Sequence, residues 1–393
     1  MKKLAFLCNN MKSTNGVERV LSQRLSLLAE SEEFDVYLIT YNQYGAPFSF
    51  PISDKVHYVD LATRYISRCS FHGFYQFIDR FKSERLFRIK LNNVLGELNP
   101  DIIVCADLHV ADLKAILSST IHALRVVECH CGLSAYFEDV KKFSCFLKRF
   151  RERVLKIKLL HSIRKFDKIV VMTEAERIDW GLSDKVVCIP NMLVTIPDKE
   201  LNKPYVQKRV ISVGRYAYQK GYDMLLDSWR HVQKKYPDWS LHIYGSNDGG
   251  VGDYQRLLEE VKQLQIGNVF LHQATDNVFS CYAQSDLYVM SSRYESFGLV
   301  LIEAMSCGLP VISFDCKYGP RTIIRDKETG VLVPYGDINE MATAICSMIE
   351  HDEERQRMAV NARRECKKYC SENIMPLWRA FYDSLVADCS LGK

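Results

Sequence analysis

Two glutamates eight residues apart, Glu295 and Glu303, are the residues of this chain whose type and setting most suggest chemistry. Glu295 falls in a loop after the apolar run Asp286–Met290, and Glu303 in the second turn of a helix expected to start near Phe297. A carboxylate on an otherwise apolar helix face is costly without a partner, and a pair of sugar hydroxyls would be one. The alternative is that Glu303 caps the helix or pairs with an arginine, while Glu295 is merely solvated.

The same helix start offers a place for negative charge. Backbone amides at a helix N-terminus have no partner within the helix and favour a diphosphate. The amides expected there belong to four consecutive residues, Phe297, Gly298, Leu299 and Val300.

A second pair of charged residues follows the run Arg209–Val213. Arg215 and Lys220 lie five residues apart in the turn Gly214–Gly221. Two cations at one strand tip can converge on a single dianionic group, although such residues are also common on any protein surface.

Two further candidates lie in the first half of the chain. Gly16 precedes a helix after the first apolar run, and glycine there allows a phosphate to approach the backbone. His130 follows the run Arg125–Cys129, between Cys129 and Cys131. Alternate residues of a strand point to opposite faces and no second cluster has zinc spacing, so we expect no metal here. A structural turn at Gly16 and a structural role for His130 remain alternatives.

The elements that position these residues alternate along the chain as in βαβ units, which predicts an α/β fold with parallel sheets. Short apolar runs rich in β-branched residues predict the strands Lys3–Cys8, Phe34–Thr40, Asp101–Ala106, Arg125–Cys129, Lys168–Met172, Arg209–Val213, Ser240–Tyr244, Asn268–His272, Asp286–Met290, Pro310–Phe314 and Gly330–Val333. The segment Ile189–Pro204 has three prolines and no periodicity, which is typical of a linker. We therefore expect two domains, 1–190, joined by the C-terminal helix 376–393, and 191–375.

These motifs together resemble the retaining glycosyltransferases of family 4. The segment from Glu295 to Glu303 resembles that family's E-x7-E signature, and the likeness continues through Gly319-Pro320 and Gly330–Val333. The resemblance implies the GT-B fold, in which two Rossmann-like domains face a central cleft, and transfer of a sugar from a nucleotide diphosphate to an acceptor hydroxyl. It also implies that Glu303 binds the ribose hydroxyls of the donor and that Glu295 contacts the transferred sugar.

The remaining motifs take their roles from the same resemblance. Arg215 and Lys220 match the family's G-R-x4-K-G element, which neutralises the diphosphate leaving group. Gly16 matches the second glycine of its G-G-x-E-R element, whereas Asn15 stands where the family has the first. His130 matches a histidine at a strand tip that contacts the transferred sugar. The catalytic candidates are thus Glu295, His130, Arg215 and Lys220.

The sequence also bears on the class of protein and on its partners. No G-x-G-x-x-G follows the first strand and no G-x4-G-K-[ST] occurs, so a dinucleotide-dependent oxidoreductase and a P-loop NTPase are disfavoured. The net charge of +4 gives no reason to expect a nucleic-acid partner. Scattered cysteines and an N-terminus without a long apolar run predict a cytoplasmic protein. No metal or other cofactor is expected, because the cations offset the diphosphate charge and no Asp-x-Asp triplet occurs.

The donor is expected to be a UDP-sugar and the acceptor a growing glycan or lipid-linked saccharide. A sugar-nucleotide epimerase or glycan phosphorylase of the same fold, and a non-catalytic nucleotide-sugar-binding protein, remain alternatives.

One basic segment has no place in this scheme. Residues 141–168 contain eleven Lys or Arg against two acids. Apolar residues recur there at helical spacing, namely Phe143, Leu147, Phe150, Val154 and Ile157. Either this stripe packs on the core of an ordinary surface helix, or the segment meets an anionic membrane as a peripheral contact.

Overall fold

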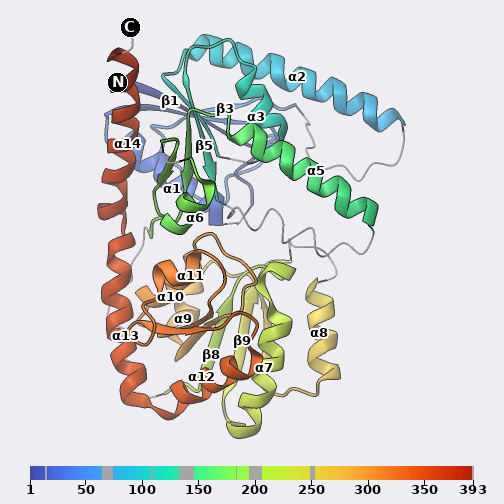
Figure 1. Ribbon diagram of the computed structural model, residues 1–393, viewed down its shortest axis with the longest axis vertical. Coiled ribbons are helices and arrows are strands. Elements are labelled where there is room, and N and C mark those ends of the chain that lie inside the picture. The colour runs from blue at the N-terminus through green and yellow to red at the C-terminus, as the bar shows by residue number, and fades with distance from the viewer. Residues whose placement is uncertain are drawn as a thin grey trace. The chain divides into compact units, whose positions relative to one another are not determined.

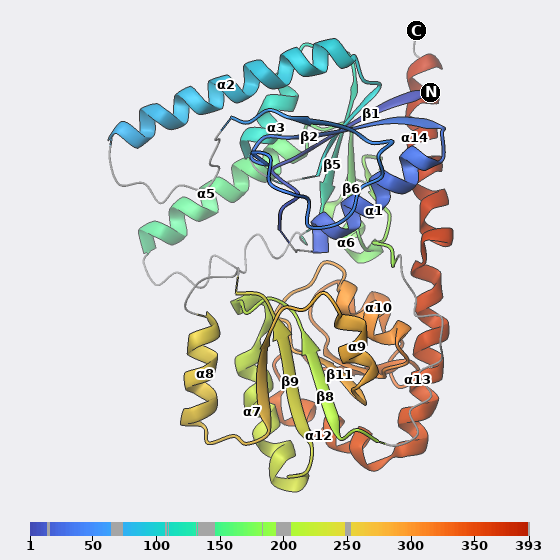
Figure 2. The same ribbon diagram turned by 180° about the vertical axis from the view of Figure 1, so that it is seen from behind.

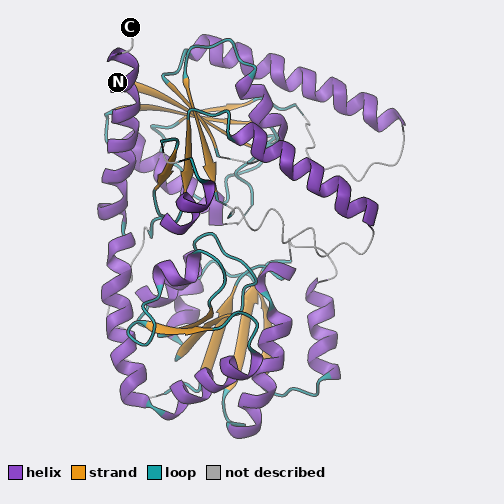
Figure 3. Ribbon diagram, in the orientation of Figure 1, coloured by secondary structure: helices purple, strands orange, loops and turns teal. Residues whose placement is uncertain are grey.

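The computed structural model describes residues 1–13, 16–63, 74–106, 108, 110–130, 132, 146–182, 184–193, 206–247 and 253–391. It divides the chain into two compact units, Met1–Ile189 with Ile374–Lys393, and Pro190–Asn373. These bounds differ from the expected domains by one residue at the linker and by two at the C-terminal return. Each unit contains one sheet of strands with helices around it (Figure 3).

The first unit contains a parallel sheet in the order β3-β2-β1-β4-β5-β6-β7 among the described residues. Its strands are β1 Lys2–Cys8, β2 Phe34–Thr40, β3 His57–Asp60, β4 Ile102–Cys105, β5 Leu124–Cys129, β6 Lys168–Val171 and β7 Val186–Cys188. Its helices are α1 Gly16–Glu30, α2 Phe74–Leu98, α3 Val110–Leu117, α5 Phe146–Ile163, α6 Glu174–Trp180 and the part of α14 (Ser371–Leu391) from Ile374 on (Figure 1).

Both faces of this sheet are covered, which explains the continuous apolar runs of its central strands. Ala5 and Leu7 of β1 belong to one buried cluster with residues of α2, α3 and α5. The opposite face carries Phe6, whose ring lies 6.2 Å from that of Tyr382 on α14. Helix α3 contacts both α2 and α5, and it lies between them in Figure 2.

The second unit contains a parallel sheet in the order β10-β9-β8-β11-β12-β13. Its strands are β8 Arg209–Val213, β9 Ser240–Gly245, β10 Val269–Gln273, β11 Leu287–Met290, β12 Val311–Phe314 and β13 Gly330–Val333. Its helices are the 3-10 helices η1 Tyr218–Lys220 and η2 Lys367–Tyr369 and the α-helices α7 Tyr222–Lys235, α8 Asp253–Gln263, α9 Val278–Ala283, α10 Leu299–Ser306, α11 Gly319–Ile323, α12 Ile338–Glu350 and α13 Asp352–Cys366.

Two strands of the first unit escaped the sequence analysis, and each lies at one edge of the sheet. Strand β3 has the sequence His-Tyr-Val-Asp, and its first two residues are exposed. Strand β7 is only three residues long. An edge strand needs no apolar residues on both faces, so β3 lacks the apolar run that marks the central strands. Strand β7 is apolar, with the sequence Val-Val-Cys, but it is too short to stand out as a strand.

Candidate functional site

The predicted cation loop of the second unit, Gly214–Gly221, follows β8 and is fixed mainly through its backbone. The Ser291 hydroxyl donates to the Lys220 carbonyl at 2.9 Å, and the Arg293 amide donates to the Gln219 carbonyl at 2.7 Å. Both donors belong to the loop after β11, the neighbouring strand. The tips of two strands that lie far apart in sequence are therefore joined, at the edge of a parallel sheet where ligands gather.

Glu295 and Lys220 come together at this junction. The Lys220 ammonium lies 2.5 Å from Glu295 Oε1, and the Ser292 hydroxyl donates to the same oxygen at 2.8 Å. Glu295 is only 8% exposed, so the interpretation as a merely solvated carboxylate was wrong. A nearly buried ion pair loses less of its attraction to solvent screening than a surface pair.

Arg215, the other predicted cation, is exposed on the same loop. Its guanidinium Nη2 donates to Gln219 Oε1 at 3.3 Å, and the Gln219 amide donates in turn to the Tyr294 carbonyl at 3.1 Å. Arg215 thus belongs to the same joined pair of loops as Lys220, with a side chain open to solvent.

Gly221 allows the two loops to approach each other closely. Its φ is +62°, and a Cβ atom built there would lie 2.2 Å from the Ser291 carbonyl oxygen. Any other residue would therefore have to push the β11 loop away from the cation loop, besides adopting a left-handed backbone.

The helix that carries Glu303 starts two residues later than the sequence analysis expected. Helix α10 begins at Leu299, because its N-cap Gly298 has a φ of +100° and cannot continue a right-handed helix backwards. The amides of Leu299 and Val300 therefore lie in the first turn, whereas those of Phe297 and Gly298 precede it. The Phe297 side chain is buried, with its ring 5.2 Å from that of Tyr369.

Glu303 lies in the second turn of α10 as expected and is 5% exposed. The Tyr282 hydroxyl of α9 donates to its Oε2 at 3.3 Å. That bond is near the long limit for a hydroxyl donor.

Two residues of this site were missed by the sequence analysis. Ser292 stands three residues before Glu295, and no residue pattern distinguishes it from an ordinary loop serine. Tyr318 adopts φ +80° and ψ −88°, which costs a non-glycine residue about 1–3 kcal/mol. It forms a β-bridge with Glu295, and the next amide, of Gly319, donates to the Glu295 carbonyl at 3.1 Å. The Gly319-Pro320 motif pointed to this turn but not to its strain.

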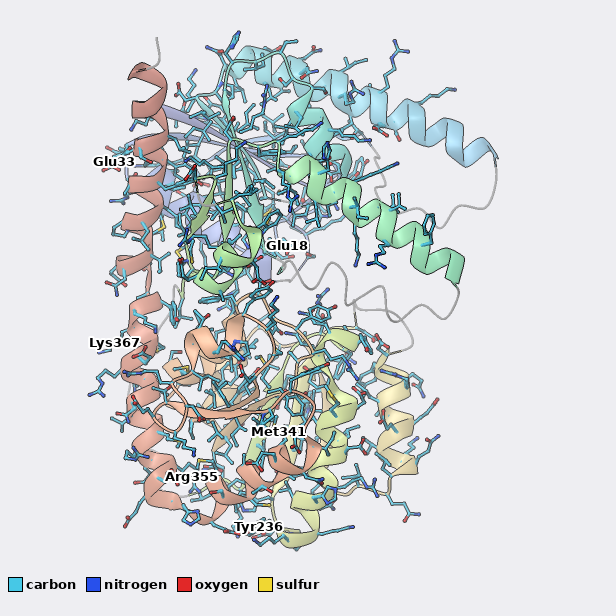
Figure 4. The ribbon with its side chains drawn as sticks, in the orientation of Figure 1. Glu18, Glu33, Tyr236, Met341, Arg355 and Lys367 are labelled. Carbon is cyan, nitrogen blue, oxygen red and sulfur yellow. The ribbon has the colours of Figure 1, made fainter. Side chains whose placement is uncertain are left out.

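The first unit contains the other two predicted site residues, Gly16 and His130. Gly16 is the first residue of α1, and Thr14 and Asn15 lie outside the described residues. Glu18 in the first turn accepts a hydrogen bond from the Ser13 hydroxyl, and Figure 4 shows it at that end of the helix. A carboxylate there also interacts favourably with the helix dipole.

His130 follows the C-terminal end of β5, and its side chain is 7% exposed. Its Nε2 lies 3.0 Å from Glu128 Oε2, and Glu128 is paired with Arg24 of α1. Cys129 is buried, while Cys131 lies outside the described residues. Over the described stretches, no three or more His, Cys, Asp or Glu side chains are grouped to hold a metal ion.

Two parallel Rossmann-like sheets, with polar and charged residues at the carboxyl ends of their strands, define the α/β fold of the GT-B type. Residues 196–365 match the family described as glycosyl transferases group 1. The matched residues lie within the second unit, Pro190–Asn373.

Two relatives that match this chain over nearly their whole length are also named glycosyltransferases. An uncharacterized glycosyltransferase of Haemophilus influenzae is 28% identical over 383 residues, covering 96% of this chain and 99% of the relative. The amylovoran biosynthesis glycosyltransferase AmsD of Erwinia amylovora is 28% identical over 391 residues, with the same two shares. In the structural comparison, a TarM mutant of S. aureus in complex with Fondaparinux, alpha-GlcNAc-glycerol and UDP has a TM-score of 0.75. It is 18% identical, and the match covers 98% of this chain and 100% of that one.

Proposed function

We propose that this enzyme is a retaining glycosyltransferase that moves a hexose or N-acetylhexosamine from a UDP-sugar to an acceptor hydroxyl. The observation that carries the proposal is the Lys220–Glu295 pair at 2.5 Å, which joins the loop expected to meet the diphosphate to the loop expected to meet the sugar. The UDP bound by TarM and the amylovoran pathway of AmsD support a UDP donor and a glycan acceptor. The acceptor is a growing cell-surface glycan or lipid-linked saccharide, and the site of action is the cytoplasm.

The roles proposed for the individual residues are those that the family resemblance implies. Lys220 and Arg215 offset the negative charge that develops on the departing diphosphate, which is the largest electrostatic demand of such a reaction. Glu303 accepts hydrogen bonds from ribose hydroxyls at α10, while Glu295 and His130 contact the transferred sugar. The amides of the first turn of α10 add neutral donors for phosphate oxygens, and Gly16 allows the phosphates to approach the backbone.

The same arrangement makes a divalent cation unnecessary in this proposal, since lysine, arginine and amides supply the counter-charge. Turnover measured after treatment with a chelator should match that of the untreated enzyme. Loss of turnover with recovery on adding manganese would assign the counter-charge to a metal instead.

The donor is identified first by binding and then by turnover. We expect UDP-sugars, rather than GDP- or ADP-sugars, to raise the melting temperature, because ligands that bind only the folded state stabilise it. The stabilising sugar nucleotide, radiolabelled in its sugar, should then be consumed with release of UDP, and Glu295→Ala is the inactive control. Binding without any turnover favours a nucleotide-sugar-binding protein, and an isomerised nucleotide sugar favours an epimerase. Consumption that requires inorganic phosphate favours a phosphorylase.

The proposal includes peripheral contact of the first unit with a membrane. Two residues of the apolar stripe of α5 support this contact, because Phe150 is 61% and Ile157 is 55% exposed. Val154 is partly buried, and Phe143 and the side chain of Leu147 lie outside the described residues. The core side of α5 is formed instead by Leu159 and Ile163. None of the described helices combines the length and the apolar character that spanning a bilayer requires. Exposed Arg153 and Lys158 flank the outward stripe, as in helices that lie in an anionic interface.

Helix α2 repeats this pattern on the same side of the sheet. Leu86 and Ile89 are 44% and 48% exposed, beside exposed Arg85 and Arg88, while Phe87 is buried in the cluster that α2 shares with α5. The outer faces of both helices therefore point away from one sheet face (Figure 1). Each Lys or Arg near an anionic leaflet contributes about 1 kcal/mol, and buried apolar side chains add to this.

Sedimentation with vesicles tests the membrane contact separately from the reaction. We expect the protein to sediment with phosphatidylglycerol vesicles at low salt and not with phosphatidylcholine vesicles. Phe150→Ser with Ile157→Ser should weaken this binding, as should changing Arg149, Arg151 and Arg153 to Glu. The matched control is Val360→Ser on α13, which removes a 69% exposed apolar side chain elsewhere. Equal binding by all variants, or none by the wild type, makes a soluble acceptor the better proposal.

A further inference from the structure

A buried chain of three polar side chains ends on His130. The Arg24 guanidinium Nη2 lies 2.6 Å from Glu128 Oε1 and 2.8 Å from Oε2. Glu128 Oε2 in turn lies 3.0 Å from His130 Nε2. The side chains of Arg24 and Glu128 are 1% and 0% exposed, so water does not weaken their interaction.

The C-terminal helix completes this arrangement. The Arg24 guanidinium lies 3.9 Å from the centre of the Trp378 ring on α14 and 5.5 Å from that of Phe6 on β1. A planar guanidinium held against an aromatic face keeps its orientation at little further entropic cost. Helix α1, strand β5 and helix α14 therefore all fix the position of Glu128.

The charge on Glu128 determines which atom of the histidine carries a proton. Burial raises the pKa of Glu128, but the attraction of Arg24 and the hydrogen bond from His130 outweigh burial, and the pKa lies below its ordinary value. Glu128 is therefore a carboxylate, which can only accept hydrogen bonds. His130 Nε2 must be the donor, so the neutral ring carries its proton on Nε2.

We propose that Arg24 and Glu128 are positioning residues that hold the His130 ring in one orientation and in its Nε2-protonated form. The inference rests on the proposed function in one respect, namely that His130 meets the transferred sugar. A buried ion pair that only stabilised the fold could be replaced by apolar residues without loss. The Arg24–Glu128 pair is instead connected to His130, which lies just beyond the C-terminal end of β5. Ligands of parallel sheets bind at that end of the strands. An acid that fixes the proton of a histidine sets which nitrogen that histidine offers to a substrate.

The ring itself provides a test that needs no turnover. In protein labelled with ¹⁵N-histidine, NMR should show neutral His130 protonated on Nε2. In Glu128→Gln the side-chain amide can both donate and accept, so both protonated forms should appear. Asp112→Asn is the matched control, because Asp112 is likewise 0% exposed in this unit and accepts from the Tyr41 hydroxyl at 2.8 Å. A folded Glu128→Gln protein whose His130 keeps the proton on Nε2 alone would overturn the inference.

Kinetics then separate positioning from stability. Removing Arg24 alone leaves a buried charge without its partner, which is strongly destabilising, so the informative variant is the neutral pair Arg24→Met with Glu128→Gln. We expect it to fold and to bind UDP as the wild type does, with kcat lowered at least tenfold, the effect of losing one charge-assisted hydrogen bond. Wild-type kcat in this variant would reduce the pair to a structural connection. If the wild type itself turns nothing over, the proposed function fails, while the NMR measurement still decides the positioning role.

Discussion

The two units hold their candidate site residues by different means. In the second unit, Lys220 and Glu295 lie on short loops after neighbouring strands, and backbone bonds and the glycine contact at Gly221 hold these loops together. In the first unit, His130 is held by side chains from α1 and β5, with α14 supporting Arg24. A site held by the backbone of short loops can be recognised as a compact sequence motif. A site held by side chains from distant segments cannot. The family match falls on residues 196–365, within the second unit.

The largest expected effects come from two candidate residues, Glu295 in the second unit and His130 in the first. Glu295→Ala and His130→Ala should lower kcat by about 10²-fold or more and leave UDP affinity unchanged, because in the proposed function both residues contact the transferred sugar. Steady-state kinetics and UDP titration measure the two quantities. A parallel loss of UDP affinity in either variant would move that residue to the nucleotide part of the site.

Because the backbone holds the two loops of the second unit together, adding a single methyl group at Gly221 should have a large effect on stability. Gly221→Ala should lower the free energy of unfolding by about 2–3 kcal/mol, from the left-handed backbone and the clash with the Ser291 carbonyl. Gly308→Ala is the control, since Gly308 has a φ of +68° but nothing within 4 Å of its built Cβ. Its loss should be about 1 kcal/mol. Equal losses in denaturant titrations would show that the close approach of the two loops matters little.

A smaller effect, on UDP affinity, is expected from Glu303, the residue of the second unit that is proposed to bind the ribose. Glu303→Ala should weaken binding of UDP by about tenfold or more, the effect of losing hydrogen bonds to a charged carboxylate. Tyr282→Phe removes only the hydroxyl that contacts Glu303 within the protein and serves as the comparison. Calorimetric titration of both variants with UDP gives the answer, and unchanged affinity in a folded Glu303→Ala protein would refute the assignment.

In the first unit, the buried carboxylate of Glu128 should make the stability of the structure around β5 depend on pH. Because the pKa of Glu128 is lower in the folded protein than its ordinary value of 4.5, its contribution to stability is present above that value. The contribution is lost as the pH falls through the lower, folded value. Hydrogen-exchange protection of peptides from β5, measured relative to the intrinsic exchange rate at each pH, should therefore fall below about pH 4.5, and less so in Arg24→Met with Glu128→Gln. An identical acid response in both proteins would contradict this.

The sequence alone determined the βαβ alternation, most of the strands, and the candidate site residues of the second unit. Those features are local: apolar runs follow from burial of a parallel sheet on both faces, and Glu295, Glu303, Arg215 and Lys220 sit at fixed spacings after single strands. It placed the start of α10 too early, because the conformation of Gly298 depends on the loop packed around it.

Only the tertiary structure decided which of these residues meet. Lys220 and Glu295 are 75 residues apart, and Arg24 and Glu128 are 104 apart, so no spacing rule connects either pair. The exposure of Phe150 and Ile157 on α5 was equally undetermined, since periodicity shows that a helix has two faces but not which one the core covers. Burial and pairing are properties of the folded chain, because they depend on segments brought together by the sheets.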